Sequence, residues 1–92
     1  MDTYVQMAER IIKQQEGIIG PVAIEQAKRV ANLSVDWKNH SVSIKGDGAK
    51  VIDKLVEQYK ELFGQISVEV CKEAAGPLVS KLSDEQLPKS LA

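Results

Sequence analysis

The sequence predicts a mainly helical (α+β) fold in which two helix–turn–helix units, related by an internal repeat, are joined by a β-hairpin. Residues 8–31 resemble residues 52–75 at a constant offset of 44 positions. Apolar residues follow helical spacing in both of these segments, whereas they alternate with polar residues across 33–45. Self-similarity at a fixed offset is typical of one supersecondary unit that is used twice.

The repeat preserves the residue types that shape helices and turns. Five pairs are identical, namely Gln14 and Gln58, Gly20 and Gly64, Glu25 and Glu69, Lys28 and Lys72, and Ala31 and Ala75. Other pairs stay apolar, including Ile18 and Leu62, Ile19 and Phe63, and Val22 and Ile66. We therefore expect one domain over residues 1–82, with units at about 2–33 and 48–82 and a flexible tail at 83–92.

The first unit begins with an amphipathic helix over residues 2–19. Gly17 or Gly20 can supply the left-handed residue that ends this helix. Pro21 suits the first position of a new helix, where its missing N–H group has no intrahelical partner to lose. The sequence therefore predicts a second helix over residues 21–33.

Residues 33–45 have the alternation of two short strands. Leu33, Val35 and Trp37 alternate with polar residues before the turn, and Val42 and Ile44 do so after it. We expect the turn at Lys38-Asn39, because asparagine tolerates the left-handed conformation that tight turns require. A lone two-stranded hairpin is marginally stable in water, so its apolar side must lie on the helices or pair with another chain.

The second unit follows a glycine-rich break at residues 46–48, where Asp47 is a candidate cap for a helix over 49–63. Gly64 ends or bends that helix. The next residues alternate as a strand would, but they also fit one helical face. The repeat favours a helix over 65–75, with a strand as the alternative.

The end of the chain carries a second Gly-Pro pair, Gly76-Pro77, which predicts a separate short helical turn over 77–82. Ser83 and Gln86 can form a capping box, although Pro88 stops any helix soon afterwards. We expect residues 83–92 to form the flexible tail, with Leu87 as its one docking residue.

Charge and cysteine content limit the function classes. The net charge is −1 and no run of like charge occurs, which argues against nucleic acid and anionic lipid as partners. One cysteine permits no intrachain disulfide and fits a reducing compartment. The first residues lack a basic-then-apolar leader, and no apolar stretch approaches the roughly 18 residues of a membrane span. We therefore expect a cytoplasmic location without membrane attachment.

The residues that could carry chemistry are few and scattered. His40 is the only histidine, and a single histidine without a cysteine cluster makes a poor metal site. Cys71 has no second histidine to serve as its base and matches a core position in the repeat. Asp53, Glu57 and Glu61 are interleaved with lysines, as on a solvated helix face. We therefore expect no catalytic residue, no cofactor and no metal, and a protein that is not an enzyme.

These observations favour a protein–protein interaction or regulatory module that self-associates, with a second copy and an unidentified protein as its partners. The candidate contact residues lie on the hairpin that needs cover: Trp37, Val35, Val42 and Ile44. Tryptophan is enriched at binding hot spots, although Trp37 can equally cover the core of its own domain.

The alternative function is a small nucleic-acid-associated transcriptional regulator. Two helix–turn–helix units suit such a role, and the predicted helix over 21–33 offers side chains that can reach base edges. These side chains are Gln26, Lys28, Arg29 and Asn32.

The segment Ile18-Ile19-Gly20-Pro21-Val22-Ala23, with the alanine-bearing amphipathic helix after it, resembles a known signature. It is similar to the "IGP" motif of small helical domains attached to bacterial signalling proteins, including some kinases and response regulators. The resemblance covers residues 18–33 and implies an interaction or regulatory role. It assigns no functional residue.

Overall fold

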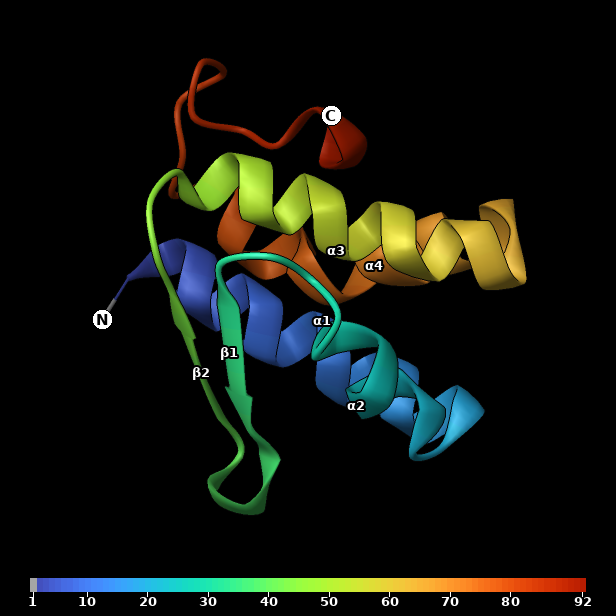
Figure 1. Cartoon of the computed structure of the whole chain (residues 1–92). Coiled ribbons are helices and arrows are strands. Elements are labelled where there is room, and N and C mark those ends of the chain that lie inside the picture. Colours follow the sequence, from blue (N-terminus) through green and yellow to red (C-terminus); the bar gives the residue numbers. More distant parts are fainter. Residues whose placement is uncertain (1) are drawn as a thin grey trace.

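The protein is mainly helical, with a two-stranded hairpin between two pairs of helices (Figure 1). The computed structural model describes residues 2–92. The helices are α1 (Thr3–Ile19), α2 (Val22–Ala27), α3 (Gly48–Phe63) and α4 (Gln65–Val79). The strands are β1 (Leu33–Asp36) and β2 (Ser41–Ile44). Short 3-10 turns follow at Trp37–Asn39 and Lys89–Leu91. The predicted mainly helical α+β fold with a hairpin between helices is thus confirmed.

The three long helices bury one continuous aliphatic core. α1 packs mainly against α4, and α3 packs against both of them. The largest buried side chains are those of Met7, Ile11, Ile12, Ile52, Leu55 and Tyr59. Burial of each large apolar side chain contributes roughly 1.5–3 kcal/mol, so this core supplies most of the driving force for folding.

α1 and α3 end at the predicted glycines, and α3 begins after its predicted cap, whereas Asp2, expected inside the first helix, caps that helix. Asp2 caps α1, because its Oδ1 accepts a hydrogen bond of 2.7 Å from the Tyr4 amide. Asp47 caps α3 through a 3.3 Å bond from the Lys50 amide. Gly20 and Gly64 end these helices with φ of 72° and 76°, a region that side-chain-bearing residues rarely adopt.

The second helix of the first pair is shorter than the predicted span of 21–33. α2 ends at Ala27, and the chain continues in turns to Asn32, which has a φ of 66°. The Asn32 carbonyl accepts a 2.9 Å bond from the Lys45 amide at the base of the hairpin. The chain must leave the helical path to enter the first strand, and a left-handed residue makes that change of direction.

The second helix of the second pair is longer than predicted. α4 is a helix and not a strand, and it continues through Gly76 and Pro77 to Val79, so the separate turn predicted over 77–82 is wrong. The buried residues Ala75 and Leu78 lie on both sides of Pro77. Their packing outweighs the single backbone bond that proline cannot donate.

The hairpin lies on α1 with its apolar side inward. Leu33 pairs with Ile44 and Val35 with Val42 in an antiparallel register. The left-handed turn residue is His40, with a φ of 51°, and not Asn39 as predicted. Asn39 instead donates a 2.7 Å bond from Nδ2 to Asp36 Oδ2, and this bond closes the turn without a positive φ at position 39.

Within the last ten residues, expected to form a flexible tail, the turn Lys89–Leu91 lies against α3, whereas residues 83–86 are exposed (Figure 1). The Ser90 amide and Oγ both bond Asp53 Oδ1, at 2.9 and 2.6 Å, and Leu91 is buried. The Tyr4 hydroxyl donates a 2.6 Å bond to the Gln86 carbonyl. Its ring leaves no room for a methyl group at Gly48, which explains the glycine at the start of α3.

Candidate interaction surface

The four hairpin residues expected to contact a partner pack against the core of their own chain. Val42 is buried, and its amide donates a 3.4 Å bond to Glu9 Oε2. Trp37 donates from Nε1 to Glu16 Oε1 at 3.1 Å. Val35, Trp37 and Ile44 are half-buried against the core. The hairpin therefore finds its cover within the chain, and the role of these residues toward a partner stays a prediction.

The exposed large apolar side chains of residues 2–92 gather elsewhere. They are Ile18, Val22, Leu62, Phe63 and Ile66, with exposed fractions of 59, 37, 50, 39 and 73 %. All five lie at the α1–α2 turn or the α3–α4 turn. These two turns emerge at the same end of the molecule, on the right in Figure 1. We call these five residues the apolar end.

The local sequence explains why these side chains are left uncovered. α1 and α3 each run to a glycine whose conformation reverses the chain at once, so the last helical turn has no neighbour beyond it. Residues 17–24 and 62–68 contain no charged side chain, although 27 % of the whole chain is charged. Isolated exposed apolar residues are common on protein surfaces, whereas a group of them at one place marks an interaction site.

The charges nearest to the apolar end in sequence are acidic. Glu16 and Glu25 flank the first uncharged stretch, and Glu61 and Glu69 flank the second. Glu16 already accepts the Trp37 indole bond. Glu69 forms a surface ion pair of 3.7 Å with Lys72. Two of the four carboxylates are therefore engaged within the chain.

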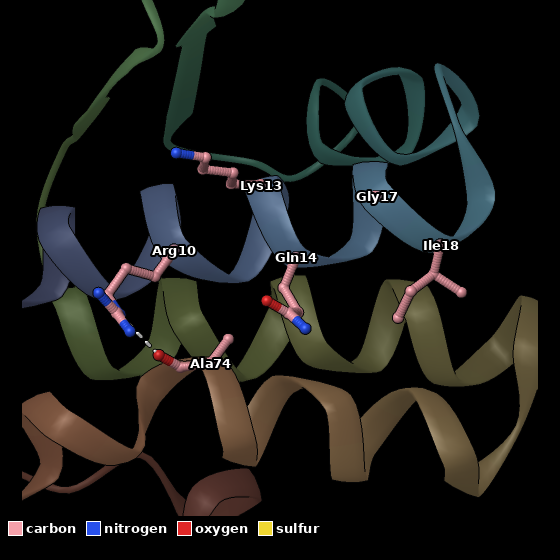
Figure 2. Close-up of a pocket in the computed structure, with 6 residues that line it drawn as sticks. All are labelled: Arg10, Lys13, Gln14, Gly17, Ile18 and Ala74. Atoms are coloured by element: carbon pink, nitrogen blue, oxygen red, sulfur yellow. Dashed lines mark hydrogen bonds between the residues drawn. The ribbon is translucent and has the colours of Figure 1, made fainter.

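A groove of about 450 Å³ runs between α1 and α4 and reaches the apolar end at Ile18 (Figure 2). Its wall on α1 carries Arg10, Lys13 and Gln14, and Ala74 of α4 lies on the opposite side. Arg10 Nε donates a 2.8 Å bond to the Ala74 carbonyl, which holds the guanidinium across the groove. The groove is basic at one end and apolar at the other.

Trp37 and His40 line a second groove of about 450 Å³ on the other side of the same two basic residues. Their rings meet edge to face, with centroids 5.1 Å apart. Because Arg10 and Lys13 border both grooves, α1 presents its basic side chains between the hairpin and α4.

Of the other groups that could carry chemistry, Cys71 and Asp53 are held within the fold, whereas Glu57 and Glu61 are exposed on α3. Cys71 is fully buried, and burial raises the pKa of its thiol to about 11, which keeps it protonated and unreactive at neutral pH. Asp53 accepts both Ser90 bonds. Within residues 2–92, no three His, Cys, Asp or Glu side chains lie close enough together to hold a metal ion.

The sequence did not reveal the apolar end, because helical periodicity assigns Ile18, Leu62 and Phe63 to the same stripes as the core residues. Apolar periodicity identifies which face of a helix is buried, but it does not show where along that face the neighbouring helix ends and the apolar residues become exposed. The usable signal was the pair of uncharged stretches, each of which contains a helix-ending glycine.

Comparison with known proteins found no matching family model, no matching curated protein and no matching solved structure. No helix within residues 2–92 has the length and apolar content needed to span a bilayer.

Proposed function

We propose that the protein is a non-enzymatic protein–protein interaction or regulatory module that self-associates. The observation that carries this proposal is the gathering of five exposed apolar side chains at one end of the molecule. Exposed apolar surface is stabilised when a partner removes it from water. The similarity of residues 18–33 to small helical signalling domains supports the same role, since that segment contains the first turn of the apolar end.

Two further elements of the proposal concern place and partners. The single buried thiol, Cys71, fits a reducing compartment, so we place the function in the cytoplasm. We also propose a second partner protein besides another copy of the chain. The groove between α1 and α4, lined by Arg10 and Lys13, offers it a surface that borders the apolar end at Ile18.

The geometry of α2 argues against the alternative of a nucleic-acid-associated regulator. A recognition helix presents its polar side chains to the groove of the duplex. α2 has six residues, and Gln26 is buried with its Oε1 accepting a 2.7 Å bond from Gln58 Nε2. One of the four side chains proposed to reach base edges is therefore held inside the fold.

Sedimentation velocity from low micromolar to millimolar concentration tests self-association. We expect a concentration-dependent shift from monomer to dimer. A chain that stays monomeric over this whole range, and that recovers no partner in a pull-down, would contradict the proposal. Duplex binding at two salt concentrations checks the alternative, because phosphate contacts weaken steeply as salt rises.

A further inference from the structure

We propose that the apolar end binds the apolar end of a second copy, and that an approximate two-fold relation between the two helix pairs makes this surface self-complementary. The inference rests on the proposed function and names the surface and the occupant. Its support comes from backbone geometry, from two buried hydrogen bonds and from the charges around the apolar end.

The turns of the two helix pairs have the same backbone geometry at positions 44 residues apart. Gly20 has φ 72° and ψ −153°, and Gly64 has φ 76° and ψ −165°. Each glycine amide bonds the carbonyl four residues earlier, at 2.9 Å in the first turn and 2.7 Å in the second. This region of φ and ψ is almost exclusive to glycine. The two turns therefore share an uncommon backbone conformation at equivalent positions.

Two buried side chains connect the helix pairs in a reciprocal way. Gln15 of α1 donates from Nε2 to the Ser67 carbonyl of α4 at 3.2 Å. Tyr59 of α3 donates from its hydroxyl to the Ala23 carbonyl of α2 at 2.7 Å. The two donors are 44 positions apart, and so are the two acceptors. Reciprocal contacts between equivalent positions are the property that defines a two-fold interface.

The same relation pairs four of the five residues of the apolar end, whereas Phe63 corresponds to the partly buried Ile19. Ile18 corresponds to Leu62 and Val22 to Ile66, and all four are exposed. Both turns emerge at one end of the molecule (Figure 1), so the approximate axis leaves the protein through the apolar end. A second copy that faces this surface therefore meets apolar side chains on both sides of the axis. A surface with this property is suited to isologous docking.

The surrounding charges favour a second copy over an anionic bilayer. Binding to such a bilayer uses lysine and arginine beside the apolar residues. Residues 16–25 and 61–69 contain neither, and each stretch has a glutamate at both ends. Glu16 and Glu69 are engaged by Trp37 and Lys72. Two of the four glutamates around the apolar end are therefore engaged within the chain. Added salt should strengthen the association, because it screens the repulsion between the other glutamates of the two copies.

Two equivalent substitutions test the inference in the full-length chain. Val22→Glu and Ile66→Glu each place a carboxylate in the apolar end, near a helix N-terminus where an acid does not disfavour folding. Ser43→Glu, at an exposed position of β2, adds the same charge away from that end. Far-UV circular dichroism checks that all three variants keep the helical content of the wild type.

We expect Val22→Glu and Ile66→Glu each to raise the dimer dissociation constant at least about tenfold, by sedimentation, while Ser43→Glu leaves it unchanged. Ile66→Leu should retain the wild-type value. If the wild type dimerises and both glutamate variants dimerise equally well, the inference is overturned and the proposed function stands. If the wild type is monomeric and binds anionic vesicles through Ile66, or binds only a different protein, the second copy is excluded as the occupant.

Discussion

Cys71 lies at the contact between α4 and α1, and its environment makes it a built-in reporter of the folded state. Its Sγ accepts a 3.5 Å bond from Gln15 Nε2, and its side chain is fully buried. Burial raises the pKa of this thiol from 9.0 to about 11, because the thiolate would lose its hydration, and the Gln15 bond offsets only part of that effect.

This raised pKa predicts a loss of stability in alkaline solution. The unfolded chain releases the thiol proton near pH 9, whereas the folded chain keeps it until about pH 11. Above pH 9 the unfolded state therefore binds fewer protons, and the free energy of unfolding falls as the pH rises. We expect a decrease of about 2–3 kcal/mol between pH 9 and 11 in urea titrations.

The variant Cys71→Ala separates this effect from tyrosine ionisation. Burial also raises the pKa of Tyr59, so tyrosine contributes in the same direction at higher pH. Wild type and Cys71→Ala should therefore diverge between pH 9 and 10 and run parallel below pH 8. Equal pH dependence of the two proteins would show that Cys71 ionises as easily in the folded chain as in the unfolded one.

Single residues also show where prediction from sequence works and where it does not. The caps Asp47 and Gly64 were predictable, because each acts within one turn of its own helix. The left-handed conformation of His40 was not predictable, because it depends on the direction in which the 3-10 turn at Trp37–Asn39 leads into β2. A cap can be predicted from the few residues around it. The backbone conformation of a connecting turn cannot, because it depends on where the two elements that it joins lie.

At the scale of elements, the α1–α2 and α3–α4 turns share one glycine conformation, although the helices that follow them differ in length. Gly20 precedes Pro21 and a helix of six residues, whereas Gly64 precedes Gln65 and a helix of fifteen. The lengths of α2 and α4 depend on the segments at and beyond their C-terminal ends. α2 must release the chain into the hairpin, but α4 has buried residues at Ala74, Ala75 and Leu78 that continue to be covered by the core. This is why the sequence predicted both helices and misplaced both ends.

Glycine replacements should distinguish these connections from ordinary helix positions. Gly20→Ala and Gly64→Ala have room for the methyl group but force a side chain into a conformation with φ above 70°. We expect each to lower the free energy of unfolding by about 1–3 kcal/mol in urea titrations, because this backbone region is almost exclusive to glycine.

Gly17 provides the matched control in the preceding turn of α1. It has helical geometry and nothing within 4 Å of an added Cβ, so Gly17→Ala should stabilise the protein by about 0.5–1 kcal/mol. The same chemical change should thus have opposite signs three residues apart. A stabilising effect of alanine at position 20 or 64 would show that the turns tolerate another conformation.

At the scale of the whole molecule, the C-terminal segment packs onto α3 and α4, which already contact each other. Leu91 is buried, with an exposed fraction of 7 %, and Ser90 bonds Asp53 of α3 through two groups. The sequence offered only Leu87 as a docking residue, since a segment without periodicity gives no sign of the surface that it covers. That surface is built by α3 and α4 and exists only after they pack.

Replacement of Leu91 by alanine should open this segment without unfolding the core. We expect a local loss of about 2 kcal/mol from the reduced apolar burial, and a roughly 30-fold faster exchange of the Ser90 amide hydrogen, which Asp53 protects. Lys89→Ala, at an exposed position in the same turn, should leave that exchange unchanged. Unaltered Ser90 protection in Leu91→Ala would mean that the Asp53 bonds alone hold the segment.

The whole-molecule view also explains how far the candidate surface could be predicted. The uncharged stretches were visible in the sequence, but their meeting at one end of the molecule depends on α1 and α3 running in the same direction (Figure 1). No local pattern encodes that relation. Trp37 was the obvious anchor by residue type, and the fold uses it to hold the hairpin to Glu16.

The hydrogen bond from Tyr4 to the Gln86 carbonyl bears on the order in which contacts form during folding. It joins residues 82 positions apart, the greatest separation of any side-chain bond among residues 2–92. Loop closure becomes costlier as the intervening chain lengthens, so this contact gains nothing until the helices between have already assembled. Tyr4 therefore reports the final step of folding, and a probe of its environment should settle later than one placed in the core.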